Sequence, residues 1–344
     1  METSIAIAYC AFAPEYMDVR VKQPIEMMRM AGARVSYCEK KIALPTTELG
    51  AAAKILVIQR ILPMQEKWVE AIRNVIAAGW LVVHEYDDYP QTPLAVERNE
   101  WQRSMGWQTF EMCHAVQTST QALADVFRPL NANVRVFENQ LSMMPKLRSG
   151  RHEKTRLFFG AFNREQSWKP IMPVLNDVLN KNSQVEVVAV HDKAFFDALK
   201  TDHKKFHERL DYEKYLRVLS GCDIALLPLA DNQFNRYKSD IKFVEAAAAG
   251  AVVVASPTVY EGTILDGENG LLAKSVEEWA SHLELLISDK NECNRLRGNA
   301  RDYVVKNRLL VRHIDERLNW YRDLWSKRNE LNAALFAKFP DLVS

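Results

Sequence analysis

A lysine and a glutamate three residues apart, Lys242 and Glu245, mark the stretch of this sequence whose side chains best suggest chemistry. An alanine run at 246–249 and Gly250 follow, and then an uncharged, β-branched run at 251–256. The pattern predicts a helix that ends on the glycine and leads into a buried strand. A carboxylate near the start of that helix can accept two hydrogen bonds from a diol, each worth about 1.5–3 kcal/mol. An exposed lysine–glutamate pair worth about 0.3 kcal/mol is the alternative.

A second polar cluster, His84, Glu85, Asp87 and Asp88, lies at the end of a strand predicted over 80–88. Substrate-facing residues of α/β proteins lie at the carboxyl ends of their strands. We therefore expect one of the acids or the histidine to bind or orient a substrate hydroxyl, with His84, Asp87 and Asp88 as candidate catalytic residues. A capping acid with solvated charges is the alternative. Because the acids are adjacent, they do not favour a metal site.

Two cations, Arg164 and Lys169, follow a strand predicted over 156–162 and stand five residues apart. Such a pair can hold the negative charge of a diphosphate without a metal ion. The alternative is a solvated loop that carries ordinary surface cations.

Three further positions follow predicted strands. Arg20 could contact a phosphate or an acceptor, or it could pair with Glu15 or Asp18. Gly262 and Thr263 could offer backbone N–H groups to a phosphate at a helix start, or they could form an ordinary turn.

Short apolar runs that alternate with amphipathic segments must position these side chains. Such alternation predicts parallel sheets with helices on both faces. A basic, polar stretch at 145–156 interrupts it as an interdomain linker. We expect an α/β fold with two doubly wound, Rossmann-like domains, 1–148 and 149–304, and C-terminal helices at 305–344 that pack across both. The predicted strands are 4–10, 55–60, 80–88, 115–120, 134–139, 156–162, 185–191, 222–229, 251–256 and 270–273.

Three local features add to this outline. The apolar spacing over 303–325 predicts one long terminal helix. The lysines between His203 and His207 predict a solvated helix face rather than a metal site. Asn139 is expected either at the hinge between the domains or in a simple turn.

Composition limits the possible functions. The 344 residues carry a formal net charge of +1, which gives no overall attraction to nucleic acid. Five scattered cysteines indicate reduced, mostly buried thiols in a cytosol-like compartment. Neither GxGxxG after the first strand nor GxxxxGK[ST] is present, which disfavours dehydrogenases and P-loop NTPases. Without a signal peptide or an apolar run of ~20 residues, the protein is expected in the cytoplasm, or at the inner face of the membrane.

The order of several segments resembles the GT-B glycosyltransferases, most closely the retaining group 1, GT4-like family that includes enzymes of bacterial surface glycans. The stretch 222–272 looks like the donor-nucleotide domain of that family, and 160–169 looks like the first strand, loop and helix of that domain. In the first half, 19–35, 82–90 and 118–141 resemble segments of the acceptor domain.

The resemblance implies two domains that face a central cleft, a nucleoside-diphosphate sugar as donor, and no metal or other cofactor. It implies that Glu245 binds the ribose and that Lys242 pairs with a phosphate or with Glu245. It also implies that Arg164 and Lys169 hold the diphosphate, and that transfer retains the anomeric configuration.

One position departs from the family pattern, which usually has two glutamates with seven residues between them. Tyr237 stands eight residues before Glu245, and the nearest upstream acids are Asp231 and Asp240. The sugar contact must therefore come from another group, or the donor sugar is unusual, or transfer activity is lost.

We therefore expect a glycosyltransferase that moves a sugar to a glycan, lipid-linked or protein acceptor, with Arg20 and Glu85 on the acceptor side. A peripheral membrane contact through the basic linker is an option. Two alternatives stay open: a non-catalytic GT-B module or partner subunit that binds nucleotide or glycan, and a sugar-nucleotide epimerase. The base, the sugar, the acceptor and the oligomeric state are not specified by the sequence.

Overall fold

The computed structural model describes residues 4–13, 17–45, 50, 52–61, 66–90, 107–147 and 154–343. The chain forms two compact units. The first unit comprises Met1–Ser142, Tyr237–Ser239 and Leu310–Ser344, and the second comprises Met143–Arg236 and Asp240–Leu309. The predicted domain boundaries at residues 148 and 304 stay predictions. The two units are defined by their internal contacts, and such contacts do not show which segments fold independently.

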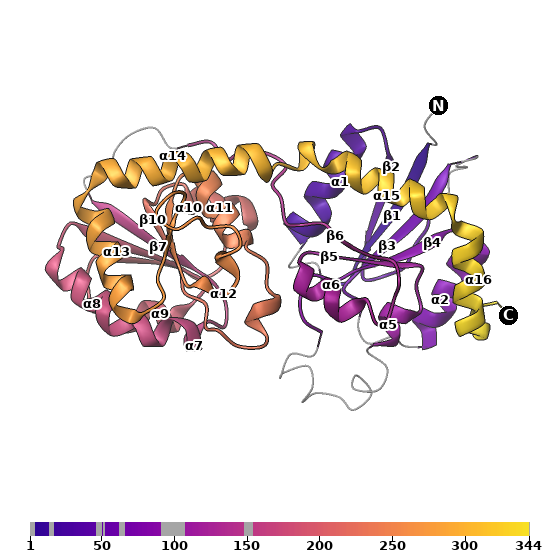
Figure 1. Ribbon diagram of the computed structural model, residues 1–344, viewed down its shortest axis with the longest axis horizontal. Coiled ribbons are helices and arrows are strands. Elements are labelled where there is room, and N and C mark those ends of the chain that lie inside the picture. The colour runs from indigo at the N-terminus through magenta and orange to yellow at the C-terminus, as the bar shows by residue number, and fades with distance from the viewer. Residues whose placement is uncertain are drawn as a thin grey trace. The chain divides into compact units, whose positions relative to one another are not determined.

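The first unit is built on a parallel sheet with strand order β2-β1-β3-β4-β5-β6. Its inner strands are almost continuously apolar, as in the "IAIAYCA" of β1, because helices bury both faces (Figure 1). The strands are β1 Ile5–Ala11, β2 Arg34–Glu39, β3 Ala53–Gln59, β4 Leu81–Glu85, β5 Ala115–Thr118 and β6 Val134–Val136.

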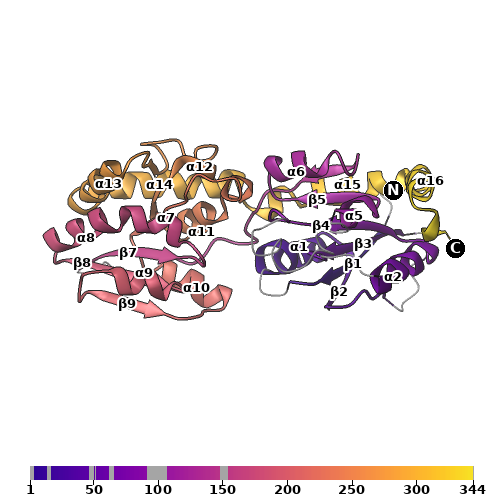
Figure 2. The same cartoon turned by 90° about the horizontal axis from the view of Figure 1, so that it is seen from below.

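Helices α1 and α15 cover one face of this sheet, and α2, α5, α6 and α16 cover the other (Figures 1 and 2). A π-helical turn at Asp18–Lys22 leads into α1. The helices are α1 Gln23–Met30, α2 Glu66–Ala77, α5 Gln108–Glu111, α6 Gln121–Phe127, α15 Ile314–Ser326 and α16 Arg328–Lys338, with a last 3₁₀ turn at Pro340–Leu342.

The second unit repeats the architecture around a parallel sheet of order β12-β11-β10-β7-β8-β9. The predicted α/β class with two doubly wound halves is therefore confirmed. The strands are β7 Thr155–Gly160, β8 Val185–Val190, β9 Lys204–His207, β10 Ile224–Leu227, β11 Val252–Ala255 and β12 Leu271–Leu272.

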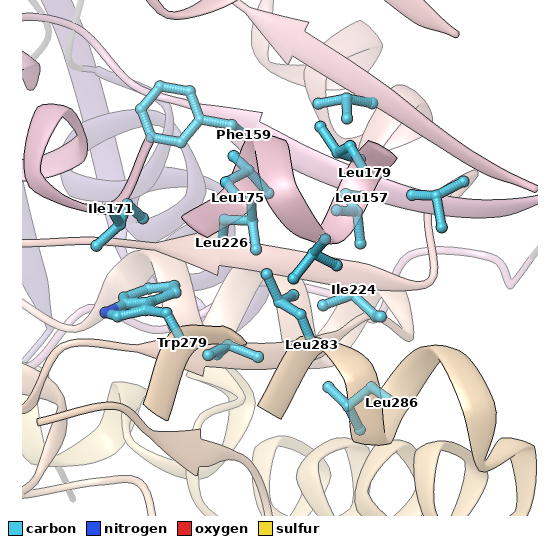
Figure 3. Packing of buried hydrophobic residues seen from close by; sticks show 14 of the residues in the cluster. Leu157, Phe159, Ile171, Leu175, Leu179, Ile224, Leu226, Trp279, Leu283 and Leu286 are labelled. Carbon is cyan, nitrogen blue, oxygen red and sulfur yellow. The ribbon is translucent and has the colours of Figure 1, made fainter. Parts of the chain in front are cut away.

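The helices of the second unit pack on two faces. Figure 3 shows Leu157 and Leu226 of the sheet packed against Leu175 of α8 and Leu283 of α13. Helices α10 and α11 lie on the opposite face, and α14 packs against both α11 and α13 (Figure 1). The helices are α7 Glu165–Trp168, α8 Met172–Lys181, α9 Lys193–Ala198, α10 Tyr212–Leu219, α11 Ile241–Ala249, α12 Pro257–Tyr260, α13 Val276–Ser288 and α14 Lys290–Asn307, with 3₁₀ turns at Lys169–Ile171, Asn235–Tyr237 and Leu310–Arg312.

Helix α11 shows why the alanine run is there. Every residue from Phe243 to Ala249 is buried, because the helix packs on the sheet and against α14. Small side chains allow that close approach. The helix ends as predicted on Gly250, whose φ of 83° is left-handed and so favours glycine.

Two predictions about single elements were wrong, and one strand was missed. The segment 303–325 is not one helix, because α14 ends at Asn307 and α15 begins at Ile314, with a turn between in which the Leu310 N–H donates to the Leu141 carbonyl. Residues 204–207 form strand β9 rather than a helix, and β2 was not predicted. Both strands lie at sheet edges, where half-exposed strands need no apolar run.

His84 of β4 points into the core of the first unit and is 1% exposed. Burial lowers the pKa of His84 to about 3, although the nearby backbone of Thr109 opposes the shift. The imidazole is therefore neutral at pH 7 and is unsuited to exchanging protons with a substrate in this conformation.

Replacing Gly250 by alanine should lower the free energy of unfolding by about 1–2 kcal/mol, the cost of a left-handed residue with a Cβ atom. The new methyl would also lie 2.7 Å from Leu147 Cδ2, so that side chain must move. Gly298→Ala is the control, since its Cβ meets nothing within 4 Å and Gly298 lies inside α14. In urea unfolding, the free energy of unfolding of this control should rise by about 0.5–1 kcal/mol. Equal changes in the free energy of unfolding for the two variants would contradict a role of Gly250 as the C-cap of α11.

The buried His84 should make stability depend on pH. Because its pKa falls from 6.5 to about 3 on folding, the unfolded state binds the extra proton as pH drops below 6.5. Stability from this group is full above pH 6.5 and falls by about 1.4 kcal/mol per pH unit below it, or about 2 kcal/mol at pH 5. His84→Leu should flatten urea-unfolding free energies measured from pH 7.5 to 5. An unchanged slope would show that His84 is solvated.

Candidate functional site

The loop after β7 is shaped by Gly160. A Cβ atom there would lie 2.6 Å from the Phe158 ring and 2.9 Å from the Tyr215 ring, so only glycine fits between them. The loop then places Arg164 at the start of α7, where its guanidinium donates to Asn235 Oδ1 at 2.8 Å.

Lys242 and Glu245 occupy the second and fifth positions of α11, so Glu245 lies in the second turn of the helix rather than at its very start. Glu245 is 3% exposed. Lys242 Nζ donates to Glu245 Oε2 at 3.2 Å and to the Tyr215 hydroxyl at 2.9 Å, and it lies 4.2 Å from the centre of the Tyr215 ring. The predicted pair exists, but its acid is buried, so the alternative of an exposed ion pair is wrong.

The pKa values of two buried tyrosines, Tyr215 and Tyr260, depend on the charged side chains near them in the second unit. Burial raises the pKa of Tyr215 well above its usual range, and the nearby Glu245 raises it further. Burial also raises the pKa of Tyr260 to about 12, while Arg164 and Lys242 act to lower it. Two cations and one carboxylate therefore share a partly desolvated region. Such a group can hold an anion beside a diol.

Lys169 lies apart from this group. Its side chain is 61% exposed and pairs with Glu165 at 2.6 Å. It lines a cavity of about 470 Å³ beside α8, and among the described residues neither Arg164 nor Glu245 lines that cavity. The spacing of Arg164 and Lys169 did not place both cations together, and a phosphate role for Lys169 stays a prediction.

Thr263 and Gly262 lie in the turn after α12. The Thr263 hydroxyl donates to Asp240 Oδ2 at 2.6 Å, and its backbone N–H donates to the Tyr260 carbonyl at 3.0 Å. Arg308 also binds Asp240, with both carboxylate oxygens at 2.5 and 2.7 Å. Since these polar groups of Thr263 bind protein partners, its assignment to a phosphate stays a prediction that the geometry does not strengthen.

The position of the missing glutamate is taken up by packing within the first unit. The Tyr237 ring stacks on Tyr89 at 4.4 Å, and its carbonyl accepts from the Thr120 hydroxyl at 3.3 Å. In the second unit, Asp231 pairs with Arg236 at 2.6 Å. Asp231 and Asp240 thus each form an ion pair with an arginine.

Arg20 and Glu85 meet in the core of the first unit. They are 3% and 0% exposed, and Arg20 Nε donates to Glu85 Oε1 at 2.7 Å. Of the two alternative partners, Asp18 pairs with Lys22 at 3.4 Å, and Glu15 lies outside the described residues. Burial raises the pKa of Glu85, and Arg20 opposes that shift.

A polar network surrounds this ion pair. Gln117 Nε2 donates to Glu85 and to the Tyr9 hydroxyl, and the Tyr321 hydroxyl donates to Gln117 Oε1 at 2.7 Å. Arg20 also donates to Asn139 Oδ1 at 3.0 Å, and Asn139 donates to Ser239 within the same unit. The network ties α15 to the sheet, and its burial does not favour acceptor contact by Arg20 or Glu85.

Asp87 and Asp88 follow β4, and each lies closest to a different cation, although Arg60 also comes within 4.0 Å of Asp88. Arg60 Nε donates to Asp87 Oδ1 at 2.6 Å, and Lys238 Nζ donates to Asp88 Oδ1 at 3.2 Å. Burial acts to raise the pKa of Asp87, but the guanidinium groups of Arg60 and Arg20, together with hydrogen bonds, outweigh it and hold the pKa below its usual range. The Asp88 side chain is 29% exposed and is the more accessible of the two acids.

Sequence reasoning missed several side chains of the second unit. The Phe162 ring is 55% exposed and stacks on His191 at 4.1 Å, and His191 stacks toward Tyr215. His191 has a φ of 74°, a conformation rare for a histidine. An exposed aromatic beside a strained residue at the ends of β7 and β8 can present a flat surface to a ligand. Only the position of Phe162 just after an apolar run could have indicated it.

The described residues show neither a cluster of metal ligands nor a membrane-spanning helix. No group of three or more histidine, cysteine, aspartate or glutamate side chains is arranged to hold a metal ion. No helix there is long and apolar enough to span a membrane.

Comparison with known proteins relates this geometry to a family. Residues 175–319 match the family described as "Glycosyl transferase-like". Among curated proteins no sequence matches significantly. The match covers α10, α11 and the residues around Glu245, but it begins after Arg164 and Lys169.

Solved structures extend the likeness to most of the chain. Sucrose-phosphate synthase from Thermosynechococcus elongatus is 15% identical with a TM-score of 0.66, covering 94% of this chain and 99% of that one. Anabaena Alr3699/HepE, solved with UDP and glucose, is 13% identical with a TM-score of 0.61, covering 92% and 98%. The pneumococcal O-GlcNAc transferase GtfA, solved with UDP and GlcNAc, is 10% identical with a TM-score of 0.60, covering 79% and 57%.

These identities are low, so the structures show a shared fold, and the family match supplies the relationship in sequence. Both agree with the resemblance that the ordered segments indicated. The chain has the GT-B fold, and its residues 175–319 are similar to the glycosyl transferase-like family.

Proposed function

We propose that this protein transfers a sugar from a uridine diphosphate donor to a glycan, lipid-linked or protein acceptor, with retention of configuration. The observation that carries the proposal is the buried carboxylate of Glu245, held by Lys242 on α11 inside the segment that matches the family. A buried carboxylate is costly unless polar partners compensate it, and a ribose diol is one such partner.

The choice of nucleotide is supported by two proteins of similar fold. Anabaena Alr3699/HepE was solved with UDP and glucose, and pneumococcal GtfA with UDP and GlcNAc. In this chain the exposed ring of Phe162, stacked on His191, would offer a flat apolar surface for a base at the same sheet edge.

In the proposed reaction, the bond between the anomeric carbon and the β-phosphate oxygen breaks. The acceptor oxygen bonds to that carbon on the same face, and its proton passes to the departing diphosphate. Arg164 and Lys242 would stabilise the charge that develops on the diphosphate, since both lie near Tyr260. Lys169 could join them only after leaving Glu165.

Binding would require a local change around Glu245. Its carboxylate is 4% exposed and the Lys242 side chain is 35% exposed. Lys242 is therefore the mobile partner, and its ammonium would turn from Glu245 and Tyr215 toward the diphosphate. On the acceptor side, Asp88 is the acid that best fits a role in orienting a hydroxyl, because it is more exposed than Asp87.

A second function is favoured by one observation. The acids nearest to the missing glutamate, Asp231 and Asp240, are both bound to arginines. If no other group holds the sugar, the protein would bind the nucleotide without transferring from it, as a non-catalytic GT-B partner.

UDP should raise the melting temperature of the wild type more than GDP, ADP, CDP or TDP do. At 100 times its dissociation constant, a ligand stabilises a fold by about 2.7 kcal/mol. Glu245→Gln should weaken UDP binding about 10- to 100-fold, the equivalent of one or two charge-assisted hydrogen bonds. Glu213→Gln, at an exposed position of α10, is the control and should bind UDP as the wild type does. Equal affinity in both variants would remove Glu245 from the site.

Transfer should yield a product with the anomeric configuration of the donor, as read by NMR with UDP-glucose and UDP-GlcNAc. Lys242→Met should reduce kcat about 10²–10³-fold, as expected when one charge-stabilising group is lost. Lys274→Met, at an exposed position, should leave kcat unchanged. An inverted product would refute retention, and UDP binding without any transfer or hydrolysis would favour the non-catalytic alternative.

A further inference from the structure

Two cysteines of the first unit are direct neighbours in the sheet. Cys10 on β1 and Cys38 on β2 are paired in register across parallel strands. Their sulfur atoms lie 3.0 Å apart. Sequence separation hides this relation, because 28 positions divide the two residues along the chain.

The two thiols have different access to solvent. Cys10 is buried, and its sulfur lies 3.9 Å from the Ala43 carbonyl oxygen. Cys38 is partly exposed on β2, the edge strand of the sheet, and its sulfur contacts the Lys41 carbonyl at 3.2 Å. An external reagent can therefore reach Cys38 first, with Cys10 directly behind it.

The geometry suits a covalent bond between them. Neighbouring strands lie about 4.8 Å apart. Disulfides join Cα atoms about 4.4–6.8 Å apart, so residues in register meet that requirement. The sulfur atoms need to approach by only about 1 Å to reach bonding distance.

We propose that Cys10 and Cys38 are a redox modification site, at which a small disulfide such as oxidised glutathione converts the two thiols into an intramolecular disulfide. The inference rests on the first unit alone and is independent of the proposed transfer reaction. The remaining cysteines, Cys113, Cys222 and Cys293, are all buried and lie outside β1 and β2.

The reaction takes two exchange steps. The Cys38 thiolate attacks one sulfur of oxidised glutathione, and glutathione thiolate leaves and takes up a proton. Cys10, as its thiol loses a proton, then attacks the Cys38 sulfur of the mixed disulfide, and the second glutathione leaves. Two protein thiols are oxidised by two electrons, and one glutathione disulfide is reduced to two glutathione molecules. Burial raises the pKa of Cys10, which fits Cys38 as the first attacker.

The test incubates the folded full-length protein in defined mixtures of oxidised and reduced glutathione, and then alkylates it under denaturing conditions. Oxidised wild type should keep three of its five thiols. Trypsin should yield a linked pair of the peptides 1–20 and 35–40, with an intact mass lower by two hydrogens. The protein should stay monomeric on a non-reducing gel.

Serine variants separate the two roles. Cys10→Ser should stop at the Cys38–glutathione adduct, and Cys38→Ser should leave Cys10 reduced under the same conditions. Cys222→Ser should form the linked peptide as the wild type does. The proposal is overturned if wild type accumulates the Cys38 adduct without the linked peptide. It is equally overturned if disulfides form only between molecules, or if Cys10 and Cys38 resist oxidation as Cys113 does.

Discussion

The close packing of α11 decides where the charges of the second unit can lie. From Phe243 onward the helix is buried along its whole length, against the sheet and α14, and its alanines leave no space for solvent. A carboxylate on such a helix is stable only with partners in reach, because an unpaired buried charge is costly. Lys242 and Tyr215 supply those partners in this structure, and Arg164 lies close enough to influence Tyr260 beside them. A ligand that binds Glu245 must therefore compete with the protein's own cation.

The same physical requirement explains the fate of the acids in the first unit. Glu85 and Asp87 are both adjacent to guanidinium groups, but Glu85 is enclosed by Arg20, Gln117 and α15. Asp88 faces Lys238 at a partly exposed position. Four polar residues that look equivalent in the sequence thus divide into a core histidine, a core ion pair and two acids nearer the surface. Alternation along β4 causes part of this division, because neighbouring side chains point to opposite faces.

The sequence predicted the fold well where residues are buried on both sides. The inner strand β11 is a continuous apolar run, β3 and β8 are apolar except for one or two residues, and Gly250 ends α11 as its position suggested. Edge strands β2 and β9 were missed or assigned to a helix, since a half-exposed strand carries charges that blur its pattern. In the candidate site, Glu245 could be identified from the sequence because an alanine run and a glycine follow it, a pattern that indicates a buried helix. Sequence spacing could not show that Lys169 turns toward Glu165, or that Thr263 binds Asp240, because those contacts depend on loop conformation.

The segment Tyr237–Ser239 has a consequence for exchanging parts between related proteins. It belongs to the first unit, although the residues on both sides belong to the second, so the polypeptide passes between units after residues 142, 236, 239 and 309. Tyr237 stacks on Tyr89, and Lys238 binds Asp88. A chimaera that takes everything from residue 143 to residue 309 from a homologue would bring a foreign tripeptide against a native surface. Such grafts would need the three residues to be kept from the recipient, so that recombination breakpoints fall on both sides of them rather than at a single linker.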